Sequence, residues 1–194
     1  MSLIVTKGSS YISATVNGTP GIPYSVSNGN ETAELLTGET VYFDNLDPST
    51  EYPLTISREY KMVKNIRVKG TTQPLSIAEV RSWLWDGTRV ENAGTATQSS
   101  TNYGGVASRA LDINGNLSWS GKSVTHTKGG SNNWWNWELT EALPITKITL
   151  WGRKDCCQSR IKGAILMAYD TDGNIIAEKT LGTTTSGQVL TVQV

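Results

Sequence analysis

The sequence has little of what a metal cluster or a disulfide framework requires, since its 194 residues include one histidine and two cysteines. The cysteines, Cys156 and Cys157, are adjacent, whereas cysteines that bind zinc normally have other residues between them. Two cysteines also form at most one bridge, which is too few for a disulfide scaffold. The composition therefore argues against a zinc protein and against a disulfide-rich fold.

An excess of charge of one sign and a long hydrophobic run are also missing. The chain has 17 basic and 17 acidic residues, of which residues 1–73 hold six basic and seven acidic ones. This even spread argues against nucleic acid or an anionic membrane as partner. No stretch is long enough to span a bilayer, and the first residues lack the basic and apolar regions of a signal peptide. We expect either that a leader was removed or that the protein leaves its cell on a particle released by lysis.

Long helical periodicity is absent, whereas 19 glycines and many serines and threonines indicate an all-β protein with many turns. Tryptophan is missing from the first 82 residues, and all seven lie between Trp83 and Trp151. This break predicts two domains with different cores, over residues 1–72 and 75–194. The linker between them is too short for wide motion. The segment after it, 75–85, fits a short helix or a strand.

Residues 1–72 contain several short strand patterns, the last of them at residues 64–70. A run in this part resembles the corner before strand F of fibronectin type III and related immunoglobulin-like β-sandwiches, where a Leu-x-Pro-x-Thr-x-Tyr segment sets the tyrosine hydroxyl against upstream backbone. The matching residues are Leu46, Pro48, Thr50 and Tyr52. The resemblance implies an immunoglobulin-like spacer that has no ligand of its own and joins the chain to a larger assembly.

Residue types suited to sugar binding gather between Ser123 and Arg160, a stretch that contains the only histidine and both cysteines. An arginine fork can donate to two neighbouring hydroxyls, and an imidazole can accept from one hydroxyl or donate to another. An aromatic surface suits the apolar face of a pyranose. Asp155 stands between Arg153 and Arg160 and is expected to pair with them and fix their rotamers.

Three aromatics in four residues of a strand must fill both of its faces, so core positions are favoured over ligand contacts for Trp134, Trp135 and Trp137. A hairpin with an Asp-Gly turn is expected over residues 164–176, without chemistry of its own.

Residues from about 92 to 181 resemble F-type lectins, the fucose-binding family of the fucolectins, which has a discoidin-like jelly-roll fold. The family's binding signature is a histidine followed 27 residues later by Arg-x-Asp-x-x-x-x-Arg. Here the same spacing joins His126, Arg153, Asp155 and Arg160. Further matching stretches are Ala96–Ser100, Ala107–Asp112, Gly121–Thr127 and Asn133–Leu139.

The resemblance implies a site for terminal L-fucose or a similar sugar. His126, Arg153 and Arg160 would bind O3, O4 and the ring oxygen, and Cys156 and Cys157 would form a vicinal disulfide that packs against carbons 1 and 2. Trp119, seven residues before His126, would contact the 6-methyl group, with Tyr103 as a weaker candidate. The alternatives are that Trp119 belongs to the core and that the cysteines are reduced thiols without a role.

The resemblance also implies one structural calcium ion, held by the Arg109 carbonyl, Asp112, Asn114 and Ser123. Calcium prefers such oxygen donors. The family usually closes this site with a C-terminal Cys-Glu pair, and often bridges that cysteine to one at the position of Val124; both cysteines are absent here. The alternative is a turn rich in Asp and Asn without a metal.

We therefore expect non-catalytic binding of a fucosylated or similar cell-surface glycan, at an extracellular or virion surface, for example as a host-attachment part of a bacteriophage tail. The alternative setting is the carbohydrate-binding module of a secreted bacterial lectin or glycosidase. A hydrolase is disfavoured because glycoside hydrolysis needs two carboxylates, and no serine stands in a nucleophile elbow. A domain with the fold but no working site is disfavoured by the joint presence of His126, Arg153 and Arg160. A homotrimer would suit weak sites, although nothing in the sequence encodes one.

Overall fold

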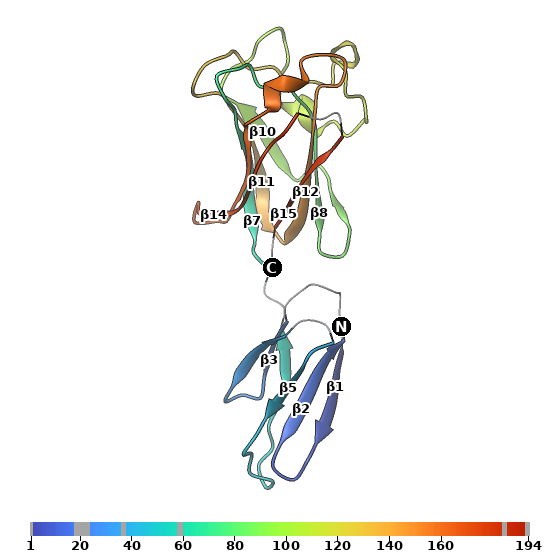
Figure 1. Cartoon of the computed structure of the whole chain (residues 1–194), viewed down its shortest axis with the longest axis vertical. Helices are drawn as coiled ribbons and strands as arrows, with labels where there is room; N and C mark the ends of the chain where they lie inside the picture. The colour runs from blue at the N-terminus through green and yellow to red at the C-terminus, as the bar shows by residue number, and fades with distance from the viewer. Residues whose placement is uncertain (1, 18–23, 36–37, 58–59, 184–185, 193–194) are drawn as a thin grey trace. The chain divides into compact units, whose positions relative to one another are not determined.

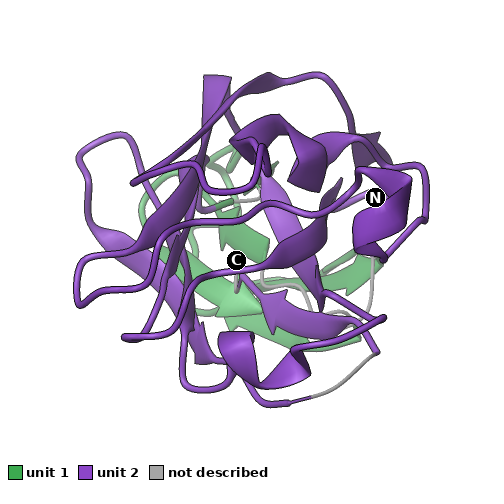
Figure 2. Cartoon of the chain, turned by 90° about the horizontal axis from the view of Figure 1, so that it is seen from above, with its two compact units in different colours: residues 1–60, 194 green, residues 61–193 purple. Residues whose placement is uncertain are grey.

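The structure is a computed structural model that describes all residues except 1, 18–23, 36–37, 58–59, 184–185 and 193–194. The described residues form strands, turns and three short 3-10 helices, with no α-helix among them, which confirms the predicted all-β class. They divide into two compact units, and the division falls between Tyr60 and Lys61 (Figure 2). Within the described ranges, no helix is long and apolar enough to cross a membrane.

Unit 1 consists of two antiparallel sheets, with the strand orders β1-β2-β5 and β4-β3-β6 (Figure 1). The strands are β1 Ser2–Lys7, β2 Ile12–Asn17, β3 Tyr24–Ser27, β4 Thr32–Leu35, β5 Thr40–Phe43 and β6 Thr55–Ser57. Alternation along β2 points Ala14 and Val16 to one face. There they join a small core with Tyr24, Val26, Leu35 and Phe43.

The tyrosine contact expected in unit 1 is present, because the Asp47 N–H donates to the Tyr52 hydroxyl over 3.1 Å. The turn is held further by the Asp47 carboxylate, which accepts from the Ser49 N–H over 2.8 Å. A tyrosine corner and two antiparallel sheets are features of immunoglobulin-like sandwiches. The assignment of unit 1 to that class stays a prediction.

Unit 2 consists of a five-stranded antiparallel sheet, β10-β11-β7-β13-β14, and a four-stranded one, β15-β12-β8-β9. Its strands are β7 Val63–Lys69, β8 Ile77–Leu84, β9 Arg89–Val90, β10 Gly94–Gln98, β11 Trp134–Leu143, β12 Ile145–Gly152, β13 Ile165–Tyr169, β14 Ile175–Thr180 and β15 Gln188–Thr191. The segment that fitted a helix or a strand is thus strand β8. The expected hairpin over 164–176 is formed by β13 and β14. These stacked sheets are consistent with the predicted discoidin-like jelly roll.

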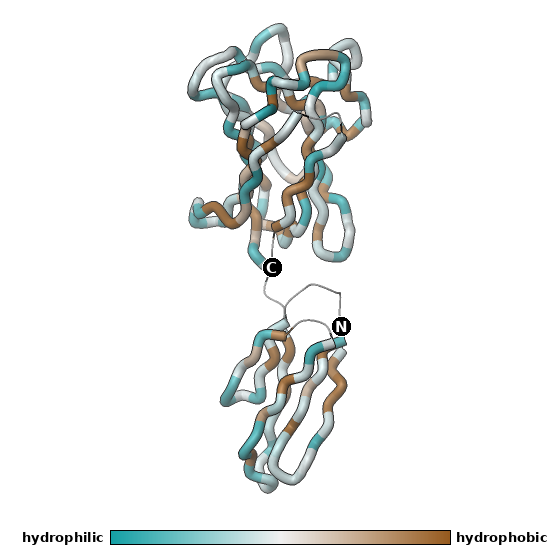
Figure 3. Tube along the Cα trace, viewed as in Figure 1, coloured by the Kyte–Doolittle hydropathy of each residue, from teal (hydrophilic) through white to brown (hydrophobic). Residues whose placement is uncertain are grey.

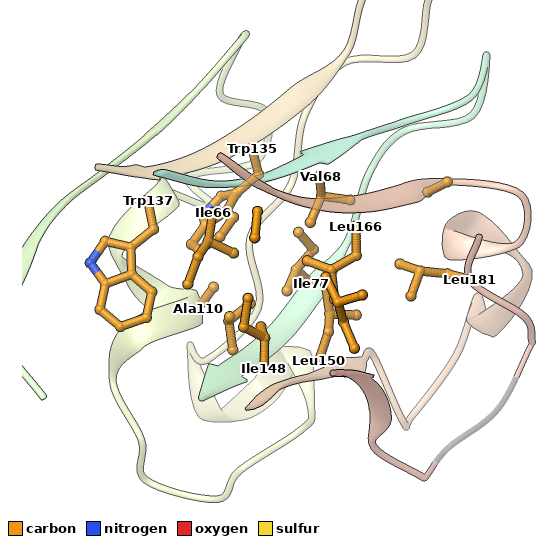
Figure 4. Close-up of a cluster of buried hydrophobic side chains, with 14 of the residues drawn as sticks. Ile66, Val68, Ile77, Ala110, Trp135, Trp137, Ile148, Leu150, Leu166 and Leu181 are labelled. Carbon is orange, nitrogen blue, oxygen red and sulfur yellow. The ribbon is translucent and has the colours of Figure 1, made fainter. Parts of the chain in front are cut away.

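The two sheets of unit 2 enclose one hydrophobic core (Figure 4). Trp135 and Ile66 of the five-stranded sheet and Ile148 and Leu150 of the four-stranded sheet are fully buried in it. Each such side chain contributes about 1.5–3 kcal/mol to folding by leaving water. The apolar segments of the chain accordingly recur along these strands (Figure 3).

The three clustered tryptophans divide between the two faces of β11. Trp135 and Trp137 are buried in the core, as predicted. Trp134 lies on the outer face, where the Arg67 guanidinium is 4.7 Å from the centre of its ring. The outer face of the five-stranded sheet therefore carries an aromatic side chain that the core does not use.

The domain boundary predicted at residues 72–75 requires correction. Residues 64–70 were expected to end the N-terminal sandwich, but most of them form β7, which lies between β11 and β13 in unit 2. Ile66 and Val68 are fully buried in the core of that unit. The local alternation of these residues fits any half-buried strand, so only pairing with strands far along the chain decides which core β7 joins.

Two long connections of unit 2, from β10 to β11 and from β12 to β13, lie at the same end of the unit (Figure 1). They contain the 3-10 helices η1 Ala107–Leu111, η2 Trp119–Gly121 and η3 Gln158–Ile161. All residues predicted to bind sugar or calcium belong to these two connections. Strands β11 and β12 lie between the two connections in the sequence. The chain leaves this end of the unit along β11 and returns to it along β12, so segments about thirty residues apart come together.

Candidate functional site

His126 lies in an extended segment that is held on two sides. Backbone and hydroxyl groups of Thr125 and Thr127 exchange four hydrogen bonds of 2.8–3.1 Å with residues 75–77. On the other side, the His126 N–H donates to the Gly105 carbonyl over 2.8 Å. A Cβ on Gly105 would lie 2.6 Å from the His126 nitrogen, so glycine is required for this approach. The backbone under the imidazole is therefore rigidly placed.

Two hydrogen bonds determine the protonation of the His126 ring. Nδ1 lies 2.8 Å from the Thr127 carbonyl and must donate to it. Nε2 lies 2.9 Å from Nη1 of Arg160, which can only donate, so Nε2 accepts. Burial lowers the pKa of His126, and the charges of Arg160 and Arg153 lower it further, against the opposing effect of the Thr127 carbonyl. The ring is thus a neutral imidazole with its proton on Nδ1.

Arg153 and Asp155 form a bidentate ion pair. Nε and Nη2 of Arg153 donate to the two carboxylate oxygens over 2.7 and 2.8 Å. The hydrogen bonds from Arg153 lower the pKa of Asp155 to about 2 and raise the pKa of Arg153. The Trp119 N–H also points at this carboxylate, 3.3 Å away. Asp155 therefore orients Arg153, as predicted, and also anchors helix η2.

Arg160 does not share that carboxylate, contrary to the prediction that Asp155 pairs with both arginines. Its Nη1 donates to His126 and, over 3.2 Å, to the Ser76 hydroxyl. A guanidinium has five N–H donors, and these are its hydrogen bonds to the described residues, so most of the fork stays free for a ligand.

Two aromatic rings stand edge-to-face around the His126 imidazole. The ring centres of Trp119 and Tyr103 are 5.7 and 5.3 Å from it. The Arg153 guanidinium lies 5.2 Å from the Trp119 ring centre. Trp119 is half-buried and does not belong to the hydrophobic core, which argues against its alternative role as a core residue. Tyr103 is 76% exposed, and it faces solvent beside an imidazole that is only 4% exposed.

Cys156 and Cys157 are joined by a disulfide, which confirms the predicted vicinal bridge and excludes the alternative of free thiols. Cys157 adopts a left-handed backbone conformation with φ +60° and caps helix η3, which carries Arg160. The bridge thus lies in the connection between the two arginines. Both cysteines are half-buried, so part of the bridge remains accessible.

Backbone strain is concentrated in the connections that form the site. Six non-glycine residues among those described have a positive φ, a conformation that costs free energy and often marks functional sites. Four of them belong to these connections, namely Tyr103, Ile113, Lys122 and Cys157. Ile113 is β-branched and has φ +44°, which makes it the most unusual of these conformations.

Ile113 lies in the predicted calcium loop, where Asp112, Asn114 and Ser123 come together. The Ser123 hydroxyl oxygen lies 2.7 and 3.0 Å from the two Asp112 oxygens and 3.1 Å from the Asn114 oxygen. One hydroxyl proton cannot serve three acceptors, and a cation is the kind of group that draws such oxygens together. These side chains offer one carboxylate, one amide oxygen and one hydroxyl, which are oxygen donors of the kind that calcium binds.

Arg109, whose carbonyl is predicted to bind calcium, also makes contacts through its side chain. Its guanidinium lies 5.4 Å from the Trp119 ring centre and donates to the Val124 carbonyl over 3.3 Å. Arg109 thus links the predicted calcium loop to Trp119 of the candidate site. Neither this contact nor the partnership of Ser76 with Arg160 has a signal in the sequence, because both depend on loops that meet only in the fold.

Asp155 is ionised and bonded to Arg153 through both oxygens, so its role in this geometry is to orient the guanidinium. The free N–H groups of the two arginines and the half-buried disulfide offer a small surface that combines fixed donors with apolar atoms.

Comparison with known proteins found relatives for this part of the chain. Residues 110–194 match a family model described as the NedA-like, galactose-binding domain. Fucolectin-6 of Anguilla japonica is 38% identical over 104 residues, which are 50% of this chain and 56% of that protein. Fucolectin of Anguilla anguilla is 40% identical over 76 residues, 37% of this chain and 48% of that protein.

Residues 110–194 are thus similar to a galactose-binding domain, and part of the chain is similar to fucolectins. The match to the family model begins within helix η1, whereas the compact structural unit that contains it begins at Lys61. The chain spans about half the length of the curated relatives it matches. The comparison with solved structures found no match.

Proposed function

We propose that unit 2 binds a terminal L-fucose or a closely similar sugar without catalysis. One observation carries the proposal: His126, Arg153 and Arg160, which are separated by up to 34 residues, are connected through direct contacts with Trp119 and with one another. Carbohydrate binding is also the function that fucolectin homologues and a galactose-binding-like domain support.

Each residue has a distinct part in this proposal. The free N–H groups of Arg153 and Arg160 donate to neighbouring hydroxyls and to the ring oxygen. His126 accepts from Arg160 through its Nε2 lone pair and thereby orients the guanidinium of Arg160 for the sugar. Trp119 and Tyr103 border the 6-methyl group, and the Cys156–Cys157 bridge covers the carbon atoms at the other edge of the ring.

Titration calorimetry with L-fucose tests the proposal. We expect a Kd between micromolar and millimolar, typical of a shallow site with few anchors. Arg153→Ala should weaken binding by roughly ten- to a hundredfold, because a hydrogen bond to a charged group contributes about 1.5–3 kcal/mol. The matched control is Arg89→Ala, which removes an equal charge from an exposed ion pair with Glu91. Normal fucose binding by Arg153→Ala protein would locate the site elsewhere.

The calcium ion is a second part of the proposal. Asp112, Asn114 and Ser123 would hold it, and it would fix the loop that leads from Arg109 toward Trp119. Calcium at a hundred times its Kd should stabilise the protein by about 2.7 kcal/mol. Differential scanning calorimetry should therefore show a rise of a few degrees with calcium that Asp112→Asn abolishes, and an equal melting temperature in calcium and in chelator would exclude the ion.

We further propose that the chain acts as an attachment module at an extracellular or virion surface, such as a bacteriophage tail, with unit 1 as a spacer. The vicinal disulfide supports a location outside a reducing cytosol. A secreted lectin or a glycosidase module is the competing setting, and a trimer would strengthen weak sites. Light scattering of the purified protein and the nature of the proteins encoded beside it test these points.

A further inference from the structure

The outer face of the five-stranded sheet carries a groove that the proposed fucose site does not use. Two hollows, with volumes of about 510 and 350 Å³, lie side by side on this face and share Arg67, Trp134 and Tyr169 in their walls. Hollows of this size are typical of small-molecule sites. The shared residues make the two hollows one continuous surface, which spans strands β10, β11, β7 and β13.

Strand register arranges four residues of this groove, three of them polar, in a row. Thr97 pairs with Asn136, Asn136 with Arg67, and Arg67 with Met167. Neighbouring strands are about 4.8 Å apart, so the row extends over roughly 14 Å. This length exceeds one sugar ring and suits a short chain of them.

The charges that line the groove have one sign. Its walls contain the cations Arg67 and Lys69 and no acidic side chain. Within the part of the chain that the structure describes, no carboxylate forms an ion pair with Arg67, and its guanidinium lies over the Trp134 ring. Stacking leaves the N–H edge of a guanidinium available, and that edge matches the two oxygens of a carboxylate.

The remaining groups of the groove match sugar hydroxyls. Asn136 donates to the Asn65 oxygen over 3.3 Å, which leaves the Asn136 oxygen and the Asn65 amide protons for a ligand. Tyr169 adds a second aromatic wall, oriented by a contact of its hydroxyl with Met167 sulfur at 3.2 Å.

We propose that this groove is a second glycan site, which binds an acidic oligosaccharide through a carboxylate on Arg67, ring contacts with Trp134 and Tyr169, and hydroxyl contacts with Asn65 and Asn136. This groove shares no residue with the proposed fucose site. It would bind an acidic chain of sugars, whereas the fucose site would bind one neutral terminal sugar. A chain with both sites would hold one glycan coat through a neutral terminal sugar and an acidic backbone at once.

The probes are trigalacturonate and its fully methyl-esterified form, which has the same rings without the charges. Titrations of the full chain should show binding of the acid at least fivefold tighter than of the ester, with shifts of the Trp134 indole resonance. Arg67→Gln should reduce acid affinity to that of the ester, and Arg67→Lys, which keeps the charge but loses the fork, should cause an intermediate loss. Asn136→Ala should weaken binding of both probes.

L-Fucose serves as the internal control. Arg67→Gln should leave fucose affinity unchanged, and Arg153→Ala should leave trigalacturonate affinity unchanged, so each site can fail separately. The groove proposal is overturned if neither probe binds, if acid and ester bind equally, or if folded Arg67→Gln protein, verified by its melting temperature, retains full affinity for the acid.

Discussion

At the scale of single residues, the site depends on which atoms of His126 carry protons. Nδ1 donates to a backbone carbonyl and Nε2 accepts from Arg160. Protonation of Nε2 would place an N–H against the guanidinium and break this contact. Because the chain has one histidine, its titration can be followed without interference.

The pH dependence follows from the lowered pKa of His126 in the folded protein. In the unfolded chain a histidine titrates near 6.5, roughly, so as the pH falls the unfolded chain takes up the proton first. The stability that the neutral ring contributes is complete above that pH and is lost as the pH falls through the folded pKa. We expect fucose affinity to decrease over the same range, measured by NMR titration of the His126 ring protons and by calorimetry.

His126→Gln provides the control for this prediction. The melting temperature of the parent protein should fall between pH 7 and pH 5, in part because His126 takes up a proton. The variant should lack this part of the decrease. Equal pH profiles of the two proteins would mean that the titrating group is not His126.

At the scale of structural elements, the segment from Arg153 to helix η3 acts as a single unit. It contains the ion pair with Asp155, the disulfide and Arg160, and its Lys154 N–H is bonded to the Leu117 carbonyl over 2.8 Å. Arg153 and Asp155 are two residues apart, which is why their pairing could be predicted, whereas the partners of Arg160 lie outside the segment.

Removal of the disulfide should affect binding more than stability. Adjacent cysteines close almost no loop, so the bridge constrains the unfolded chain very little. In the folded protein it lies at the start of η3, and in the proposed site it would offer apolar surface to the sugar. Cys156→Ser combined with Cys157→Ser should weaken fucose binding roughly tenfold, about 1.4 kcal/mol, with a small change in melting temperature.

Calorimetry on the oxidised, reduced and double-serine proteins checks this expectation. A matched affinity in all three would show that the bridge does not touch the sugar, and a large loss of stability would assign it a structural part instead.

At the scale of the whole molecule, the position of β7 decides what can fold independently. β7 is the middle strand of the five-stranded sheet and contributes Ile66 and Val68 to the core. The described residues of unit 1 form a small core of six buried side chains, and a domain of its length is only marginally stable.

Two fragments test this division. Residues 61–194 should melt cooperatively and bind fucose as the full chain does, whereas residues 75–194 lack β7 and should not fold. Circular dichroism and calorimetry distinguish them. Cooperative melting of the shorter fragment at the temperature of the longer one would contradict the assignment of β7 to unit 2.

The sequence by itself determined the all-β class, the residue types of the site and the contacts between near neighbours. Arg153 and Asp155 are two residues apart, so local geometry suffices for this pair, whereas the bridge between Cys156 and Cys157 was implied by the resemblance to F-type lectins. The spacing of His126, Arg153 and Arg160 also carried the resemblance to F-type lectins.

Only the tertiary structure decided the rest. It joined His126 to Arg160 and Arg160 to Ser76, it gave β7 to unit 2, and it set Arg67 beside Trp134 on an outer face. Alternation along a strand states which residues share a face, but it does not state which strand lies alongside. Such partners are chosen by the free energy of burying whole sheets against each other, which no local stretch of sequence contains.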